Sequence, residues 1–112
     1  MSPRLPSARA GKPIDALDYE IAQEMAGALG RLGRALERAL QALAEFDATA
    51  AAGNGPSNQG ARDTRRRLTV EAGHALWLFI VQREACGLRD SRQIMRDYRV
   101  PPEVGNRIGA FP

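Results

Sequence analysis

Hydrophobic positions in the first half of the chain recur at a helical spacing. Ten apolar residues follow one another at intervals of three or four: Ile14, Leu17, Ile21, Met25, Leu29, Leu32, Leu36, Leu40, Leu43 and Phe46. This spacing places them on one face of an α-helix. Acidic residues stand in the first turns, where the helix dipole favours negative charge. The pattern predicts one long amphipathic helix over residues 14–48.

A second apolar segment, residues 75–81, contains no polar residue at all. It is far shorter than the roughly 20 residues of a membrane span, and a helix that is apolar all round lies inside a packed body. A short buried strand is the alternative, but helix formers flank the run and no turn pair bounds it. We therefore expect a second helix over residues 62–88, covered on every side of this run.

The C-terminal quarter predicts two short helical pieces. Asp90 and Gln93 have the spacing of a capping box, which predicts a helix over residues 91–98. The Val100-Pro101-Pro102 sequence ends it, because proline restricts the preceding residue and donates no backbone hydrogen bond. A helical turn over residues 103–108 should follow. These pieces should form a cap on the two long helices.

Two segments have the composition of irregular structure. Residues 1–13 contain three prolines and no acidic residue, and residues 49–61 are rich in Gly, Ser and Asn. We expect a disordered basic tail over 1–13 and a flexible loop over 49–61. The expected fold is all-α: one domain over residues 14–112, built as an antiparallel helical hairpin with a short C-terminal helical cap.

Charge is divided between the two halves of the chain. Residues 13–50 carry seven acids and three bases, whereas residues 61–112 carry six acids and ten bases. In an antiparallel hairpin Glu45 and Asp47 come level with Arg65 to Arg67, so the opposite charges should pair. The alternative interpretation is a nucleic-acid-binding surface made by the basic second half. Its residues would be Arg62, Arg65, Arg66 and Arg67.

Glycines inside the first predicted helix suggest a close contact. Gly27, Gly30 and Gly33 recur every three residues, although each costs about 1 kcal/mol relative to alanine in a helix interior. The row either lets another helix approach closely or marks a break near residue 30. The cap and the hairpin partner leave one side of the apolar run uncovered. We therefore expect a homodimer that forms a four-helix bundle, with Gly27, Gly30, Gly33, Trp77, Leu78 and Val81 at its interface, or else an unidentified protein partner.

Metal chemistry has one weak candidate. Glu71 and His74 have the Glu-x-x-His spacing, and a dimer would present two copies together with a glutamate such as Glu37 from each first helix, as in di-iron bundles. The simpler interpretation pairs Glu71 with Arg67, one turn earlier.

Other chemistry has less support. Residues 92–109 could form a helix-turn-helix, but Met95 and Arg99 stand where a small residue and a glycine are usual. Cys86, the single cysteine, is expected to be an ordinary buried residue. No catalytic set and no cofactor fingerprint is visible. We expect neither an enzyme nor a cofactor.

Two segments resemble a family of small bacterial all-helical proteins of unknown function. They are Ala16–Glu24 (ALDYEIAQE) and Gln82–Val104 (QREACGLRDSRQIMRDYRVPPEV), less than a third of the chain. The resemblance implies no activity, substrate or site residue. The lone cysteine and the absence of a recognisable signal peptide or membrane span suggest a cytoplasmic protein. The sequence thus predicts a noncatalytic oligomerisation or protein-interaction module.

Overall fold

The computed structural model describes residues 13–53 and 58–108, and this part of the chain is all-helical. The elements are α2 (Pro13–Ala51), α3 (Gln59–Ala85), α4 (Ser91–Asp97) and α5 (Pro102–Arg107). The predicted all-α class is confirmed. The tail expected over 1–13 lies outside the described residues except for Pro13, the first residue of α2. Residues 54–57 of the expected loop also lie outside them.

Both long helices reach further into the expected loop than the sequence suggested. α2 continues to Ala51, and α3 begins at Gln59 because the Asn58 side chain accepts a hydrogen bond of 3.0 Å from the backbone N–H of Ala61. The end of α3 has a different cause. Gly87 adopts a φ of 87°, and the backbone N–H of Leu88 donates to the carbonyl of Arg83. This left-handed glycine cap ends α3 at Ala85, three residues before the expected boundary of 88.

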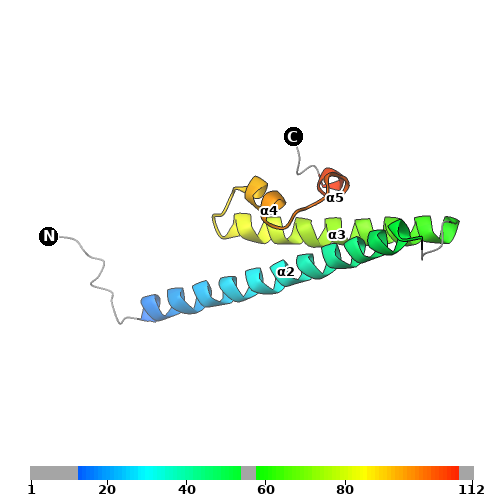
Figure 1. Ribbon diagram of the computed structural model, residues 1–112. Helices are drawn as coiled ribbons and strands as arrows, with labels where there is room; N and C mark the ends of the chain where they lie inside the picture. Colours follow the sequence, from blue (N-terminus) through cyan, green and yellow to red (C-terminus); the bar gives the residue numbers. More distant parts are fainter. Residues whose placement is uncertain (1–12, 54–57, 109–112) are drawn as a thin grey trace.

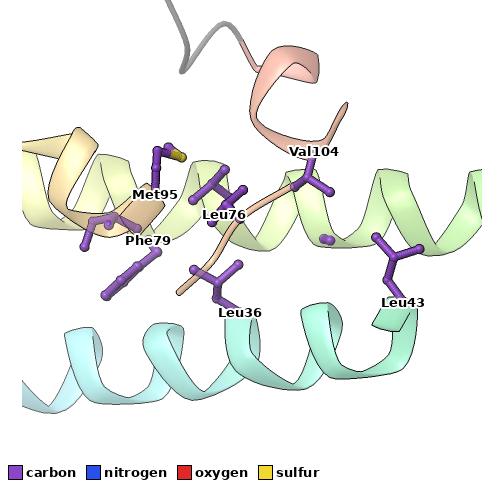
Figure 2. Packing of buried hydrophobic residues seen from close by; sticks show 9 residues of the cluster. Leu36, Leu43, Leu76, Phe79, Met95 and Val104 are labelled. Carbon is purple, nitrogen blue, oxygen red and sulfur yellow. The ribbon is translucent and has the colours of Figure 1, made fainter. Parts of the chain in front are cut away.

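The two long helices pack side by side as an antiparallel hairpin, and α4 and α5 lie on α3 (Figure 1). The core lies where all four described helices meet. Figure 2 shows Leu36 and Leu43 projecting from α2 toward α3, and Leu76 and Phe79 on α3 within the same cluster. The cap completes the core with four further buried residues: Ile94, Met95, Val100 and Val104. Burying these side chains removes apolar area from water, which stabilises the cap on the hairpin.

The apolar run of α3 is not covered on every side within the chain, and cover of the remaining side by a second copy stays a prediction. Leu76 and Phe79 are buried, but Trp77 is 49 % exposed and Val81 is 42 % exposed. The cause is the small number of neighbours. One long helix and a short cap cover only part of a helix circumference. The further expectation that a side bearing Trp77 would face water is confirmed.

The N-terminal end of α2 projects beyond the end of α3 (Figure 1). Leu17 and Ile21 continue the apolar face that carries Leu36 further along α2, yet they are 54 % and 47 % exposed. α2 has 39 residues and α3 has 27, so about the first 12 residues of α2 have no long helix opposite them in the described chain. The projecting end is therefore an apolar surface without an intrachain cover.

Gly33 makes the close contact that the glycine row suggested, but the contact lies inside the chain. A methyl group at Gly33 would lie 2.9 Å from Tyr98 Oη and 3.5 Å from the Phe79 ring. The two rings pack edge to face, with centroids 5.5 Å apart. At Gly27 and Gly30 a methyl group would meet only arginine side chains of α2 itself. α2 is one continuous α-helix, so the alternative of a break near residue 30 is not observed.

Replacing Gly33 by alanine should destabilise the protein, whereas Gly30→Ala should not. Overpacking against Tyr98 and Phe79 costs about 1–3 kcal/mol, partly offset by the roughly 1 kcal/mol that alanine gains in a helix. We expect Gly33→Ala to lose up to about 2 kcal/mol in urea unfolding. In Gly30→Ala the arginine side chain moves aside, and stability should be unchanged or up to about 1 kcal/mol higher. Equal stabilities of the two variants would contradict the Gly33–Tyr98 contact.

Candidate functional site

Arg65 on α3 joins three helices through its guanidinium group. Its Nε and Nη2 donate to the two carboxylate oxygens of Asp47 on α2 at 2.7 and 2.9 Å. Its Nη1 and Nη2 donate to the carboxylate of Glu103 on α5 at 2.6 and 2.9 Å. Such paired, charge-assisted hydrogen bonds are directional as well as favourable. Arg65 therefore fixes the register of the hairpin and the position of the cap at the same time.

The arginine cluster predicted to pair with α2 does so only in part. Arg65 pairs with Asp47 as expected, but Gln41 on α2 donates to Glu45, and Arg67 pairs with Glu71 on its own helix at 3.3 Å. Arg62 donates to Gln59 through Nε and Nη2. Glu103 was missed in the sequence, because it lies 38 residues from Arg65 and no pattern states where the cap docks.

The ion pairs lower the pKa of both carboxyl groups of the network. Hydrogen bonding from Arg65 is the main cause for Asp47 and for Glu103, opposed in each case by desolvation. The same two carboxylates raise the pKa of Arg65, Glu103 first and Asp47 second. All three groups are ionised at neutral pH as a result.

A hollow of about 290 Å³ opens beside the Arg65 network, between α3 and α5. It is lined by Arg62, Arg65, Arg66, Thr69, Glu103 and Arg107. A second hollow, of about 410 Å³, lies between α2 and the end of α4 and is lined by Glu37, Leu40, Gln41, Asp97, Tyr98 and Arg99. Burial raises the pKa of Tyr98 at its edge, with a smaller contribution from Glu37. The first hollow is the more distinctive, because four of its six lining residues are arginines.

The metal hypothesis finds no support within one chain. Over residues 13–53 and 58–108, no group of three or more His, Cys, Asp and Glu side chains could hold a metal ion. Glu71 pairs with Arg67, as the simpler interpretation predicted, and His74 is exposed. Glu37 lines the hollow beside Tyr98. A site shared between two copies of the chain stays a hypothesis.

The remaining sequence candidates have structural positions. Cys86 is half-buried at the end of α3, where the Gln82 side chain approaches its sulfur at 3.8 Å. Arg99 takes the left-handed conformation, with a φ of 52°, in the turn after α4. In the helix-turn-helix interpretation α5 would read bases, but it has six residues and buries Val104 and Gly105 against the hairpin. This leaves few side chains for a groove of nucleic acid.

The exposed face of α3 forms a stripe that we call the α3 stripe: Val70, His74, Trp77 and Val81. Val70 and Val81 are each 42 % exposed, Trp77 is 49 % exposed and His74 is exposed. Successive residues of a helix lie about 100° apart, so Trp77 lies about 160° from Phe79, which faces α2. The stripe is therefore on the side of α3 turned away from α2. Leu78, also expected at an interface, is half-buried next to it.

The chain belongs to a family of unknown function, DUF6665, whose sequence model matches residues 5–112. The resemblance extends over nearly the whole chain, not the less than a third that two segments suggested. No curated protein and no solved structure matches the sequence. Among the described helices, none combines the length and apolar character required to cross a bilayer.

Acid should destabilise the protein through the Arg65 network. Asp47 and Glu103 have a lower pKa in the folded chain than in the unfolded chain, so the unfolded state binds more protons as pH falls. The contribution is complete above the unfolded pKa of about 4 and disappears as pH falls through the lower folded values. Urea unfolding from about pH 6 to about pH 2 should show this loss.

Asp47→Asn provides the test of the assignment. It should lower stability at neutral pH by about 1 kcal/mol, the upper range for a partly exposed ion pair, and should make the acid loss shallower. Asp63→Asn, which removes the same charge from α3 outside the network, should retain the acid dependence of the unaltered protein. An identical acid profile in Asp47→Asn would contradict the role of this pair.

Proposed function

We propose that the protein is a noncatalytic homodimerisation module whose interface is the α3 stripe. The observation that carries the proposal is the exposure of a tryptophan and two valines on one face of a helix whose opposite face is buried. Contiguous apolar surface of this kind marks interaction sites on soluble proteins, whereas single exposed apolar residues need no explanation.

The spacing of the stripe favours a second copy of the chain as the occupant. Its residues are separated by four, three and four positions, so the stripe reads the same in both directions. Two antiparallel copies related by a two-fold axis then place Val70 opposite Val81 of the second copy, and His74 opposite Trp77 of the second copy. A two-fold interface requires this self-complementarity, and the average spacing of about 3.7 residues is close to the helical period of 3.6, so the four residues stay on one face of α3.

The resulting assembly places the four long helices in a row, with the two α3 helices at its centre and the two α2 helices outside, and so differs from the compact four-helix bundle expected from the sequence. Gly33 is covered by Tyr98 and Phe79 of its own chain and drops out of the proposed interface. The stripe spans about 17 Å along the helix, which is short for a stable interface of about 800 Å² per partner. We therefore expect a dimer that forms in the micromolar range.

Nucleic-acid binding is the weaker candidate. Two of the four predicted arginines, Arg65 and Arg67, are paired with carboxylates of the same chain. The other two, Arg62 and Arg66, line the hollow between α3 and α5. A di-iron site would need Glu71 to leave Arg67 and two copies to bring their His74 side chains together, whereas the proposed dimer places His74 against tryptophan.

Trp77→Glu should convert the dimer to a monomer. Light scattering at concentrations well above the micromolar range should give twice the 12.2 kDa of one chain for the unaltered protein and 12.2 kDa for the variant. Trp77 is half-exposed, so circular dichroism should show an unchanged helix content. Tyr19→Glu, which adds the same charge at a residue 65 % exposed on α2, should leave the dimer intact. A monomeric unaltered protein would reject the dimer and redirect the stripe to another protein.

Cysteine cross-linking should show the antiparallel register. In a Cys86→Ala background, a chain with Val70→Cys and a chain with Val81→Cys should form a disulfide when mixed. Neither chain should cross-link to itself, because equivalent residues of the two copies would lie about 16 Å apart along the helices. Self-cross-linking of the Val70→Cys chain would indicate a parallel pair and would contradict the proposed symmetry.

A further inference from the structure

The hollow between α3 and α5 concentrates unused positive charge. Arg65 lines the hollow and is paired with Asp47 and Glu103, whereas the other three arginines of the lining make fewer interactions with the described chain. Arg62 donates to Gln59 through Nε and Nη2, which leaves its Nη1 without a partner in the described chain. Arg66 and Arg107 have no ion pair with any residue that the structure describes.

Hydrogen bonds within the chain hold part of the lining in place, and the remaining arginine side chains can adjust. Arg65 and Glu103 are fixed by their mutual hydrogen bonds, and the Thr69 hydroxyl donates to the backbone carbonyl of Arg65 at 2.8 Å. Arg107 lays its aliphatic stem over Gly73, where a methyl group would meet Cδ and Cβ at 3.6 and 3.7 Å. These are ordinary van der Waals distances, so the Arg107 stem packs along α3 and the residue lines the hollow from α5.

The net charge of the hollow favours a doubly charged anion as its ligand. Arg62, Arg65, Arg66 and Arg107 carry four positive charges, and Asp47 and Glu103 carry two negative charges, which leaves a net charge of +2. Guanidinium groups match the oxygens of a phosphate in shape and charge and retain their own charge at any physiological pH. A terminal phosphate carries close to two negative charges near neutral pH, whereas a phosphodiester carries one.

We propose that this hollow binds the phosphate group of a small phosphate monoester, and that Arg62, Arg66 and Arg107 are the residues that contact the phosphate. The volume of about 290 Å³ lies at the lower end for small-molecule sites, so it accommodates a phosphate with a short organic group. Arg65 is a positioning residue, because it holds Glu103 and thereby α5 and Arg107. The site shares no residue with the α3 stripe, although Arg66 lies one helical turn from Val70, and it does not depend on dimerisation.

The test is ligand binding to the full chain, measured by calorimetry and by thermal unfolding. The probes are inorganic phosphate and glycerol 3-phosphate, with sodium chloride at matched ionic strength as the control. We expect saturable binding of one phosphate per chain and a rise in unfolding temperature that grows with ligand concentration. The double variant Arg62→Gln, Arg107→Gln removes two positive charges but keeps polar side chains, and it should lose at least tenfold in affinity.

A second double variant controls for net charge. Arg89→Gln, Arg92→Gln removes the same two charges from exposed positions outside the hollow and should bind phosphate as the unaltered chain does. Circular dichroism should show that both double variants fold. If both double variants lost phosphate affinity equally, or if chloride had the same effect as phosphate, the binding would be nonspecific charge screening. Either result would overturn the proposal. Binding of a short oligonucleotide without binding of either phosphate probe would also overturn it and would favour the nucleic-acid alternative.

Discussion

The guanidinium of Arg65 is the constraint on which the arrangement of the helices depends. It is a planar group with fixed donor directions, and it satisfies a carboxylate of α2 and a carboxylate of α5 at once. Helices of six and seven residues are not stable in water by themselves, so α4 and α5 require tertiary contacts. Arg65 holds α5, and Tyr98 holds the end of α4 where Gly33 leaves room for its ring. The short cap is thus fixed at two points.

Fixing the cap on one side of the hairpin leaves other surfaces open. A two-helix hairpin has a thin core, and the cap covers only the side where Ile94, Met95 and Val104 are buried. The side of α3 opposite to α2 has no cover in the described chain, although Val70, Trp77 and Val81 lie on it. The apolar run therefore has side chains on two sides of the helix. Phe79 packs inside the chain, and Trp77 lies at the interface that we propose between chains.

The sequence predicted where the helices lie along the chain better than it predicted which residues pack against them. Periodic leucines and a polar segment between two helices defined the hairpin, and the antiparallel level of Asp47 and Arg65 followed from it. The pairing of Arg65 with Glu103 could not be predicted, because local patterns do not state where a cap docks. The exposure of Trp77 was expected once its possible neighbours in one chain were considered, because composition measures how apolar a segment is and not how many neighbours reach it. Gly33 was recognised as a close contact, but Tyr98 as its partner depends on the same unpredicted docking of the cap.

The two proposed sites on α3 should act without interfering with each other, and the reason is geometric. In the antiparallel dimer the two-fold axis passes between residues 75 and 76, so residue 66 of each copy lies level with residue 85 of the other. The two phosphate hollows are then about 30 Å apart along the helices. The Debye length is about 8–10 Å at physiological ionic strength, so two positive hollows at that separation repel each other weakly. The hollows therefore need not be neutralised before two copies can associate. A bound phosphate changes the charge near one end of α3 and does not contact the apolar residues at the centre of the proposed dimer.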